Sequence, residues 1–489
     1  MGSITKKNME KVMKSIWNEN LKMPQFNELA GDLHTEVCII GGGLCGLLTA
    51  KKLVDRGINA IVLEANRIGS GQTSGTTGKI TLQHGYIFDK LLTNLGTERA
   101  KAYFHKNAQA VKDFEKMVKD NKIDCDFEKK SNYVYSINDE EKMMDEATAA
   151  KKLGIDAHFV KNIDVPFKVA GAVEVKDQAQ YNVIKFLRSI SKGLEIYENS
   201  RVLKVEGNTA FTQKGSVRAK KVIFACHYPF VNFPGWYFGR MYCSRSYEIA
   251  FESARPIEGM YIDEDKNGLS LRQYKNFLIL CAGNHNTGKT GGKYADVLKY
   301  AYVMFPKAKE VMRWSAQDCM TPDSIPYIGL YSKKTPDWLV ATGFNKWGMS
   351  SSMVAANILV DIICGVKDEE AEVFSAKRKS LKDVSRFLKN GAEAARGIAK
   401  HALTLPKEQI TSVKKGEGKI VSHEGEKIGI YNDGDTLYAV TVRCPHMGCE
   451  LTWNAAEKSW DCPCHGSRFS YDGSIIDDPA QTSIENDIS

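Results

Sequence analysis

The sequence predicts an α/β fold divided into more than one domain, and three observations lead to this prediction. The chain has 489 residues, and at about 150 residues per domain this length suggests two to four domains. Residues 37–64 follow the pattern of a buried strand, a glycine-rich turn, an apolar-periodic helix and a second strand. Residues 240–285 show the alternation of several short strands, which indicates a further sheet.

Composition and charge exclude several classes of protein. Apolar residues make up 43% of the chain and charged residues 26%, as in folded soluble proteins. The formal net charge of +8 is spread through mixed Lys and Glu segments, so we expect a solvated surface and no nucleic-acid partner. Eight of the twelve cysteines are scattered singly, as reduced core thiols usually are.

Neither of two candidate segments predicts a membrane span. Residues 1–30 lack the apolar core of a signal peptide, and we expect a short amphipathic helix there. The most apolar stretch, residues 339–366, contains Lys346, Asp361 and a strand-to-helix break at 343–348, which favours a packed helix over a spanning one. We therefore expect a cytoplasmic protein without membrane insertion.

The first element carries a motif for a dinucleotide. The strand at 37–40 is followed by Gly41-x-Gly43-x-x-Gly46 and a helix, and the next strand ends in Glu64. Glycines let the backbone approach a pyrophosphate, the helix N-terminus supplies N–H donors, and the acid accepts from a ribose hydroxyl. The spacing therefore predicts a dinucleotide site.

Further segments of residues 33–366 resemble one family. In order they read RIGSGQTSGTTGKIT at 67–81, AKKVIFACHYP at 219–229, TPDSIPYIG at 321–329 and LVATGFNKWGMSSSMVAANI at 339–358. This order resembles the D-amino-acid oxidase family of FAD-dependent oxidoreductases. The resemblance implies a Rossmann-like FAD-binding domain, with FAD rather than NAD as cofactor.

The resemblance also implies which residues contact the cofactor. Gly41, Gly43 and Gly46 would hold the pyrophosphate and Glu64 the adenosine ribose. The other implied contacts are Ser74, Gly75, Thr76 and Thr77 along the flavin, Val202 or Val205 at the adenine, and Gly343, Phe344, Gly348 and Met349 at a helix N-terminus near the flavin. A helix N-terminus there would stabilise the negative charge that collects on the reduced ring. For the two valines, plain sheet core is an equal alternative.

One position differs from that in relatives whose flavin is bound covalently. Dimethylglycine and sarcosine dehydrogenases have a similar SGTTWH run, whose histidine is joined to the flavin, whereas here SGTTGK places Lys79 at that position. We therefore expect non-covalent FAD. Lys79 either lies near the ring and tunes its charge, or is solvated or faces a phosphate.

The material between these motifs predicts an inserted α+β substrate domain. The expected division is 31–100, 151–225 and 315–366 for the FAD-binding domain, and 101–150 and 226–314 for the substrate domain. No catalytic dyad is evident, so the catalytic residues are unknown apart from candidates in the aromatic stretch near residue 240. Trp236, Tyr237, Phe238 and Tyr242 are candidates for a cage around a cationic amine, and Arg240, Arg245 or Arg272 for holding a carboxylate. The alternative is an aromatic hinge between domains with solvated arginines.

Residues 444–469 concentrate the remaining cysteines. A structural zinc site usually pairs ligands of similar spacing, but here the pairs are Cys444-x-His446 and Cys462-x-x-His465, fifteen residues apart. This is the two-loop arrangement of a Rieske [2Fe–2S] centre, in which two thiolates hold one iron and two imidazoles hold the other.

The same loops, CPHMGC and CPCHGS, resemble the Rieske proteins of cytochrome bc complexes over residues 406–485. The resemblance implies an all-β domain at 406–489, with Cys444, His446, Cys462 and His465 as cluster ligands. It further implies a disulfide between Cys449 and Cys464.

Two nearby residues bear on the cluster potential. Ser467 matches the serine whose hydroxyl bonds a cluster sulfide, but Phe469 replaces the tyrosine of high-potential relatives. We expect a potential below that of the respiratory proteins and above that of plant-type ferredoxins. Because Tyr471 is close in sequence, it stays open whether its hydroxyl replaces the donor that Phe469 lacks.

Residues 367–405 are charged and helical in pattern, and predict a linker that lets the Rieske domain dock. Flavin takes two electrons as a hydride, whereas the cluster carries one. We expect an enzyme that oxidises a C–N bond of a small-molecule amine or amino acid and passes electrons from FAD to the cluster and an unknown redox partner. The alternatives are a reductase running from cluster to flavin, an electron-transfer or redox-sensing module without a small substrate, and a clusterless Rieske fold that binds a partner.

Overall fold

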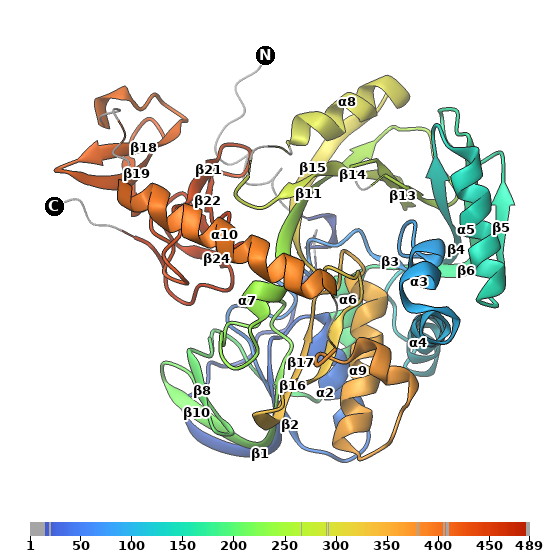
Figure 1. The fold of residues 1–489 in the computed structure, drawn as a ribbon, viewed down its shortest axis with the longest axis horizontal. Helices are drawn as coiled ribbons and strands as arrows, with labels where there is room; N and C mark the ends of the chain where they lie inside the picture. The colour runs from blue at the N-terminus through green and yellow to red at the C-terminus, as the bar shows by residue number, and fades with distance from the viewer. Residues whose placement is uncertain are drawn as a thin grey trace.

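The computed structural model describes residues 15–485, apart from 19–20, 266, 290, 292, 379–380, 404–405 and 407–409. Two large sheets form the main body, and two small sheets form a separate C-terminal unit beside it (Figure 1). The α/β class is therefore confirmed. Among the described residues we find no helix that combines the length and apolar character needed to span a bilayer.

The first sheet is mainly parallel and has eight strands within the described residues. Its main path is β16-β17-β10-β1-β2-β7, and β9 and β8 extend it from β10. The strands are β1 (Gly31–Ile40), β2 (Ala60–Leu63), β7 (Glu195–Tyr197), β8 (Lys204–Glu206), β9 (Thr209–Phe211), β10 (Gly215–Phe224), β16 (Tyr327–Ser332) and β17 (Thr335–Thr342). Ile40 lies opposite both Phe224 and Leu63, so the carboxyl ends of β10, β1 and β2 meet at one edge.

Three helices belong with this sheet: α2 (Leu44–Val54), α6 (Val183–Ile190) and α9 (Gly348–Ile363). Helices α2 and α9 pack against each other. Their buried residues are mainly apolar, apart from Thr49 of α2 and Ser350, Ser351 and Ser352 of α9, as expected of helices that lie between a sheet and further structure. The predicted Rossmann-like domain is thereby confirmed.

The second sheet follows the order β15-β11-β14-β13-β12-β4-β6-β3, with β5 paired to β6. Its strands are β3 (Lys79–Ile80), β4 (Glu128–Ser136), β5 (Ala157–Val160), β6 (Gly171–Gln180), β11 (Tyr242–Glu252), β12 (Met260–Asp263), β13 (Ser270–Tyr274), β14 (Phe277–Asn286) and β15 (Lys309–Met320). The helices around it are α3 (Phe88–Leu95), α4 (Thr97–Asp120), α5 (Glu140–Lys152) and α8 (Tyr294–Met304).

This sheet differs from the expected division of the chain. Strands β5 and β6 lie within 151–225, which the sequence assigned to the FAD-binding domain, yet they pair with β4. Strand β15 crosses the expected boundary at 314–315 and pairs with β11 along its length. The apolar alternation of these strands shows that each has a buried face, but not which sheet buries it.

The N-terminal segment also differs from its prediction. The expected helix at 1–30 falls partly on residues 1–14 and 19–20, which lie outside the described residues. The described part contains only one turn of 3-10 helix, η1 (Ile16–Asn18), followed by irregular backbone at 21–30. Trp17 is 1% exposed and Leu29 0%, so buried side chains, and not a long helix, hold this segment.

The C-terminal unit is built from antiparallel strands, as the resemblance implied. Its first sheet contains β18 (Gly418–His423), β19 (Glu426–Asn432) and β20 (Leu437–Thr441), and its second β21 (Thr452–Asn454), β22 (Ser459–Asp461), β23 (Arg468–Ser470) and β24 (Ile475–Asp477). A turn of 3-10 helix, η3 (Ile410–Ser412), precedes them. The two cysteine loops, 444–449 and 462–466, lie on either side of β21 and β22.

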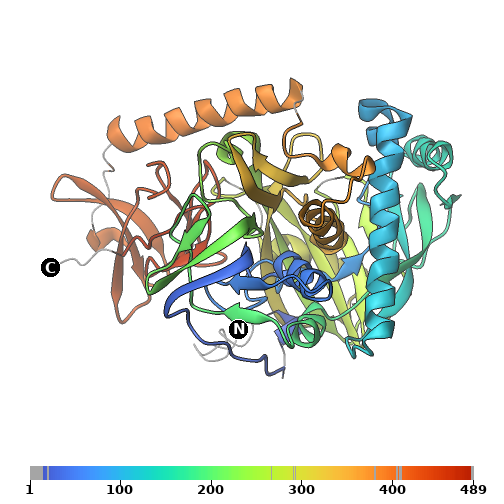
Figure 2. The same cartoon turned by 90° about the horizontal axis from the view of Figure 1, so that it is seen from below.

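The expected linker forms one long helix. After η2 (Glu370–Phe374), helix α10 (Leu381–Leu403) extends from the main body to the C-terminal unit (Figure 2). It packs against the short helix α7 (Tyr237–Arg240). Asn390 of α10 donates to the carbonyl oxygens of Phe238 and Met241 at 3.1 and 2.7 Å. The helix therefore fixes the two units together instead of acting as a flexible tether.

Candidate functional site

A cavity of about 760 Å³ lies at the carboxyl edge of the first sheet and extends to the second. The predicted cofactor residues that line it are Gly41, Gly43, Glu64, Gly75, Thr76, Thr77, Lys79, Val202, Gly343, Phe344, Gly348 and Met349. Gly46, Ser74 and Val205 are outside its lining, and Val205 packs in the sheet core. Crevices at this edge are where α/β folds bind their ligands.

The glycine turn leaves no room for side chains. Gly41 has φ of +113°, and a Cβ there would lie 2.5 Å from the carbonyl oxygen of Ala225. A Cβ on Gly46 would lie 2.0 Å from the carbonyl oxygen of Gly41, which is why Gly46 matters although it does not line the cavity. Helix α2 begins at Leu44, and its N-cap residue Gly43 has no side chain to cap it. The backbone N–H of Leu44 donates to the Thr73 hydroxyl. The turn therefore brings the backbone of Gly41, Gly43 and Leu44 to the cavity lining, where a pyrophosphate would lie.

Glu64 is held by this turn. Its carboxylate accepts from the backbone N–H of Gly42 at 2.7 Å and of Asn66 at 2.8 Å. Burial raises the pKa of Glu64, and these two donors partly offset that effect. The carboxylate is thus fixed at the end of β2, where an acid for a ribose hydroxyl is expected.

Three side chains hold the loop at 75–77 through consecutive carbonyl oxygens. Trp314 Nε1 donates to Gly75 at 3.0 Å, Trp17 Nε1 to Thr76 at 2.6 Å, and Arg272 Nη1 to Thr77 at 2.6 Å. The arginine also lies over the rings of Trp17 and Tyr274. Arg272 therefore positions the loop expected to border the flavin and does not line the cavity.

The N-terminus of α9 faces the same cavity. Trp347, Gly348 and Met349 line it, and no side chain caps the helix. His84 stacks on Trp347 with ring centroids 4.9 Å apart. Burial lowers the pKa of His84 to about 3, so this imidazole is neutral. Free N–H groups at a helix N-terminus suit the negative charge that a reduced flavin carries.

The second sheet contributes a buried polar wall that sequence reasoning missed. Glu248 of β11 is 2% exposed, lines the cavity and accepts from Ser246 Oγ and Cys281 Sγ at 2.9 and 3.3 Å through Oε1. Its Oε2 has no hydrogen-bond partner among the described residues. Burial raises the pKa of Glu248 to about 8. The sequence signal was an acid directly before the apolar residues 249–251 in a predicted strand.

Lys79 lies in the same wall. Its Nζ hydrogen-bonds to Ser270 Oγ and donates to the carbonyl oxygen of Tyr261 at 3.4 Å. Burial lowers the pKa of Lys79 to about 7. The residue is 7% exposed, so the solvated alternative for Lys79 is wrong. A lysine with this pKa is a candidate proton acceptor near neutral pH.

The expected aromatic cage is not in the cavity. Trp236, Tyr237, Phe238 and Tyr242 are absent from its lining, as are Arg240, Arg245 and Arg272. Arg240 donates to the carbonyl oxygen of Ala376 and lies over the ring of Tyr327. Tyr242 lies beneath the guanidinium of Arg386 on α10. The alternative was an aromatic hinge between the FAD-binding and substrate domains. The segment does lie at a junction, but this junction is the one between the main body and the C-terminal unit.

The four predicted cluster ligands come together in the C-terminal unit. The thiols of Cys444 and Cys462 hydrogen-bond to each other, and the rings of His446 and His465 have centroids 4.9 Å apart. The Nδ1 atoms of both histidines are buried without a hydrogen-bond partner among the described residues. Two thiols and two orphaned ring nitrogens are the donor set that a Rieske cluster needs, so the residues fit that group.

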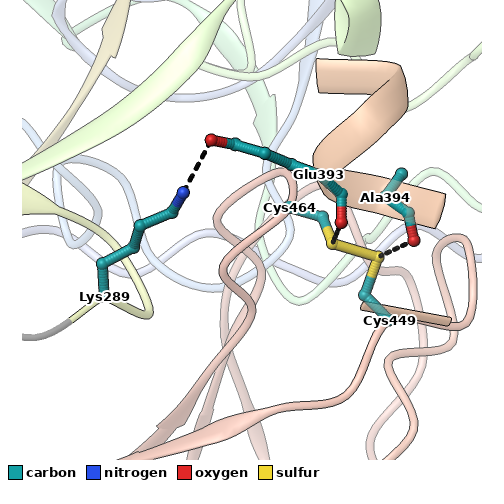
Figure 3. The surroundings of a disulfide bond; sticks show 5 residues. All are labelled: Lys289, Glu393, Ala394, Cys449 and Cys464. Carbon is teal, nitrogen blue, oxygen red and sulfur yellow. Dashed lines mark hydrogen bonds and ion pairs between the residues drawn. A yellow bond between two sulfur atoms is a disulfide. The ribbon is translucent and has the colours of Figure 1, made fainter. Parts of the chain in front are cut away.

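The predicted disulfide between Cys449 and Cys464 is confirmed. Helix α10 runs over it, as Figure 3 shows. The two sulfurs lie 3.9 and 4.0 Å from the carbonyl oxygens of Ala394 and Glu393. Cys462 Sγ is within 4.8 Å of both disulfide sulfurs. The disulfide is therefore shielded from solvent by a helix as well as by the cluster loops.

The residues near the cluster loops agree with the expected donors only in part. Ser467 is fully buried, and its hydroxyl hydrogen-bonds to the Cys444 thiol. Phe469 packs in the core of the unit. Tyr471 packs against Tyr431 and Tyr438, on the strands of the other sheet. The ring of Tyr471 therefore lies against the first sheet of the unit.

A buried ion-pair network joins the C-terminal unit to the second sheet. Arg245 is 1% exposed and donates through Nε to Glu457 Oε2 at 2.8 Å. Glu457 also pairs with Arg468 at 3.0 Å, and Arg468 pairs with Asp461 and Asp477 at 2.9 and 3.0 Å. The prediction that Arg245 holds a substrate carboxylate is therefore wrong, because a protein carboxylate from the other unit occupies it.

The C-terminal unit also covers part of the cavity. Ile476, Asp477, Asp478 and Gln481 are among its lining residues. Asp478 accepts from Arg201 Nη1 at 2.9 Å, and Asp477 accepts from Gln72 Nε2 at 2.6 Å. Burial raises the pKa of Asp478 to about 6 despite Arg201. This segment, 476–481, therefore forms one wall of the cofactor cavity.

Two cysteines connect the cavity to the cluster loops. Cys319 of β15 lines the cavity, and Cys243 lies directly opposite it on β11. The two thiols hydrogen-bond to each other, and Cys243 Sγ donates to the carbonyl oxygen of His465 at 3.3 Å. Sequence reasoning had treated both as scattered core thiols, since only the strand register brings them together.

Comparisons with known proteins agree with both halves of the chain. The family model for FAD dependent oxidoreductases matches residues 36–362, and that for the Rieske [2Fe-2S] domain matches residues 405–486. The putative Rieske 2Fe-2S iron-sulfur protein YhfW of Bacillus subtilis is 33% identical over 487 residues, which cover 95% of each chain.

Two further matches concern the flavin half. Gamma-glutamylputrescine oxidoreductase of Escherichia coli is 27% identical over 222 residues, covering 42% of this chain and 51% of that protein. The solved structure of glycine oxidase from Geobacillus kaustophilus superposes with a TM-score of 0.60 at 18% identity, covering 71% of this chain and 100% of the other.

Proposed function

The chain belongs to the FAD-dependent oxidoreductase family and carries a C-terminal Rieske [2Fe–2S] domain, and we propose that it oxidises a C–N bond of a small amine and passes the electrons through the cluster. When bound, FAD supplies a two-electron acceptor for a hydride, and the cluster supplies a one-electron carrier. Lys79 in place of a linking histidine supports non-covalent FAD. Cys444 and Cys462 would hold one iron, and His446 and His465 the other.

The short path between cavity and cluster carries this proposal. Two side chains, Cys319 and Cys243, span from the cavity lining to the backbone of His465. Because the ion pairs of Arg245 and the hydrogen bonds of α10 fix the Rieske domain in place, this path does not depend on a moving domain. A fold that keeps the two sites in contact favours electron transfer within the chain over two independent functions.

The cavity wall favours an amine over an α-amino acid. Arg201 is the arginine in the lining, and Asp478 already occupies it. Glu248 Oε2, which is buried and has no hydrogen-bond partner among the described residues, is available for a hydrogen bond with the substrate nitrogen. Lys79 Nζ is suited to take the proton of the substrate ammonium, because its pKa is about 7. An unprotonated amine is the form that can lose a hydride.

Anaerobic reduction of the holoenzyme tests this function. A panel of primary and secondary amines, amino acids and hydroxy acids is mixed with the protein while flavin absorbance and then the cluster spectrum are followed. We expect amines to bleach the flavin first and the cluster second. Bleaching by a nicotinamide or a protein donor, with no response to any amine or amino acid, would favour the reductase or relay alternatives instead.

Lysine variants separate the role of Lys79 from a general charge effect. The rate of flavin reduction should rise with pH through about 7 in the wild type, and Lys79→Met should abolish that rise. Lys142→Met is the matched control, because Lys142 also lines the cavity but pairs with Glu264. Equal pH profiles for Lys79→Met and the wild type would refute the proton-accepting role.

A further inference from the structure

An aromatic patch is exposed beside the cluster loops. It consists of Phe233, which is 55% exposed, and Trp236, which is 44% exposed. Their rings meet edge to face with centroids 4.4 Å apart. Both residues belong to the main body, in the loop that leads into α7. Exposed aromatic pairs of this kind are typical of surfaces that contact another molecule.

The aromatic patch is continuous with the proposed histidine ligands. Phe238 lies 5.6 Å from Trp236 and 5.9 Å from Phe233, measured between ring centroids. On its other side it lies 5.7 Å from the ring of His465 and 6.5 Å from that of His446. A row of ring contacts therefore leads from solvent to both histidines.

The main body holds one of these histidines directly. His446 Nε2 donates to Asn232 Oδ1 at 2.8 Å, and Asn232 immediately precedes Phe233. A hydrogen bond at one ring nitrogen fixes the ring and directs the other nitrogen, here the orphaned Nδ1, towards the metal. The same loop thus orients a ligand and presents the aromatic patch.

The loop keeps this shape at a cost. Trp236 has φ of +58°, a left-handed conformation that is unfavourable for a bulky residue. Its N–H donates to the Asn232 carbonyl at 2.9 Å, and its own carbonyl accepts from Gly239 at 3.0 Å. The two hydrogen bonds from Asn390 to the following residues reinforce the turn. A strained backbone that presents a half-exposed tryptophan indicates a functional surface.

Other sides of the cluster loops are covered by protein. Helix α10 lies over the disulfide, so closely that a Cβ on Gly397 would be 3.1 Å from Cys464 Sγ. Cys243 and Gln317 of the second sheet cover the loop at 465–466, where Gln317 Nε2 donates to the Gly466 carbonyl at 2.9 Å. The histidine side is where aromatic side chains reach solvent.

Positive charges lie on the segments that border this side. Arg386 and Lys389 precede Asn390 on α10, which bonds to Phe238 and Met241, and Arg386 lies over the ring of Tyr242. These two cations, Arg396 further along α10 and Arg443 directly before the first cluster loop make no ion pair with a described residue. Among the described acids of these segments, Glu393 pairs with Lys289, and Glu450 pairs with Lys400 and Lys427. These four cations give the segments beside the aromatic patch a basic rim.

We propose that the aromatic patch is the docking surface for a one-electron carrier protein with an acidic face. The cluster held by Cys444, His446, Cys462 and His465 would supply one electron, and the carrier's oxidised centre would accept it, without transfer of an atom or proton. A patch of two aromatic side chains with a charged rim matches the small interfaces of transient redox complexes, in which charge steers the encounter. The direction of transfer rests on the proposed function, whereas the docking surface does not.

The test uses a c-type cytochrome in two forms, the native basic protein and its lysine-succinylated, acidic derivative. The holoenzyme is reduced with dithionite, freed of excess reductant, and mixed anaerobically with each form in a stopped-flow instrument. We expect the acidic form to be reduced about tenfold faster, with a rate that falls as salt is added. Equal rates, or a faster reaction with the basic form, would overturn the proposal.

Surface variants locate the docking site. Phe233→Ala and Trp236→Ala should each slow reduction of the acidic cytochrome and weaken its binding in a calorimetric titration by about tenfold. Tyr302→Ala is the matched control, because Tyr302 is 53% exposed on α8, a helix that packs on β11 and β14 and, among the described residues, not on α7 or α10. The electron paramagnetic resonance spectrum of the cluster must stay unchanged in each variant. Patch variants that behave like Tyr302→Ala would overturn the proposal.

Charge reversal guards against a folding artefact. Lys389→Glu combined with Arg396→Glu changes exposed positions of α10 and should shift the preference towards the native basic cytochrome. An unchanged preference would contradict the basic rim as the steering element. Because dithionite replaces the substrate, failure here is distinct from failure of the proposed function, which is recognised by the absence of amine-driven flavin bleaching.

Discussion

Replacing Arg245 by methionine is expected to release the Rieske domain from the flavin domain. Arg245 is buried on β11, and its carboxylate partner Glu457 belongs to the Rieske domain. Methionine keeps most of the volume and removes the charge. Glu457 would then be left with Arg468, which must already neutralise Asp461 and Asp477.

The pKa of Glu457 gives the size of the effect. Burial raises this pKa, but Arg245 and Arg468 outweigh it and hold the pKa at about 2, against an ordinary 4.5. At about 1.4 kcal/mol per pKa unit this corresponds to about 3 kcal/mol, and breaking one partner of a buried pair costs about 3–5 kcal/mol. A depressed pKa stabilises the docked state above pH 4.5, and that contribution is lost as pH falls through 2.

Two measurements follow the release. Small-angle scattering should show a larger radius of gyration for Arg245→Met at pH 7, and thermal unfolding should separate the visible circular dichroism of the cluster from flavin fluorescence. Arg313→Met is the matched control, since Arg313 pairs with Glu310 within the same sheet. If Arg245→Met melts in one transition at the temperature of Arg313→Met and has an unchanged radius, the ion-pair network does not hold the domains.

Three further predictions follow from buried contacts. Burial raises the pKa of Glu248 from 4.5 to about 8, so the proton it binds stabilises the fold fully below pH 4.5 and progressively less as pH rises to 8. In Glu248→Gln the free energy of unfolding, measured in urea, should no longer show this fall of up to roughly 5 kcal/mol between pH 4.5 and 8. The same pH dependence in the variant and the wild type would refute the prediction. Gly397→Val should push α10 off the disulfide, cost about 1–3 kcal/mol and speed disulfide reduction by dithiothreitol. The control is Gly391→Ala, whose new Cβ meets open space and should stabilise the fold by about 0.5–1 kcal/mol. Equal rates of disulfide reduction in the two variants would contradict the contact between Gly397 and the disulfide. Asp478→Ala, by freeing Arg201, should speed FAD release on dilution about tenfold, and an unchanged release would show that segment 476–481 does not retain the cofactor.

Residues whose chemistry depends on near neighbours in sequence could be predicted. The disulfide between Cys449 and Cys464 was implied by the resemblance of the two short cysteine loops to Rieske proteins. The turn at Gly41 to Gly46 is a local pattern of strand, turn and helix. The helix at residues 348–363 followed in the same way from its small and apolar residues.

Residues whose role depends on a distant partner could not be predicted. Arg245 had the appearance of a substrate ligand because its partner, Glu457, lies 212 residues away. The pairing of Cys243 with Cys319 needs the register of β11 and β15. The aromatic segment near residue 236 was correctly identified as unusual, but only the docked Rieske domain explains why. Spacing fixes the chemistry of each half of this chain, and packing between the halves fixes their connection.

The position of residues 476–481 in the cavity wall constrains how the protein matures. These residues follow the second cluster loop and yet help to enclose the cavity for the other cofactor. A Rieske domain that docks while the cavity is empty would narrow that site from one side, with Asp478 already bound to Arg201. Flavin loading is therefore coupled to the docking of the Rieske domain, and one domain helps to retain the cofactor of the other.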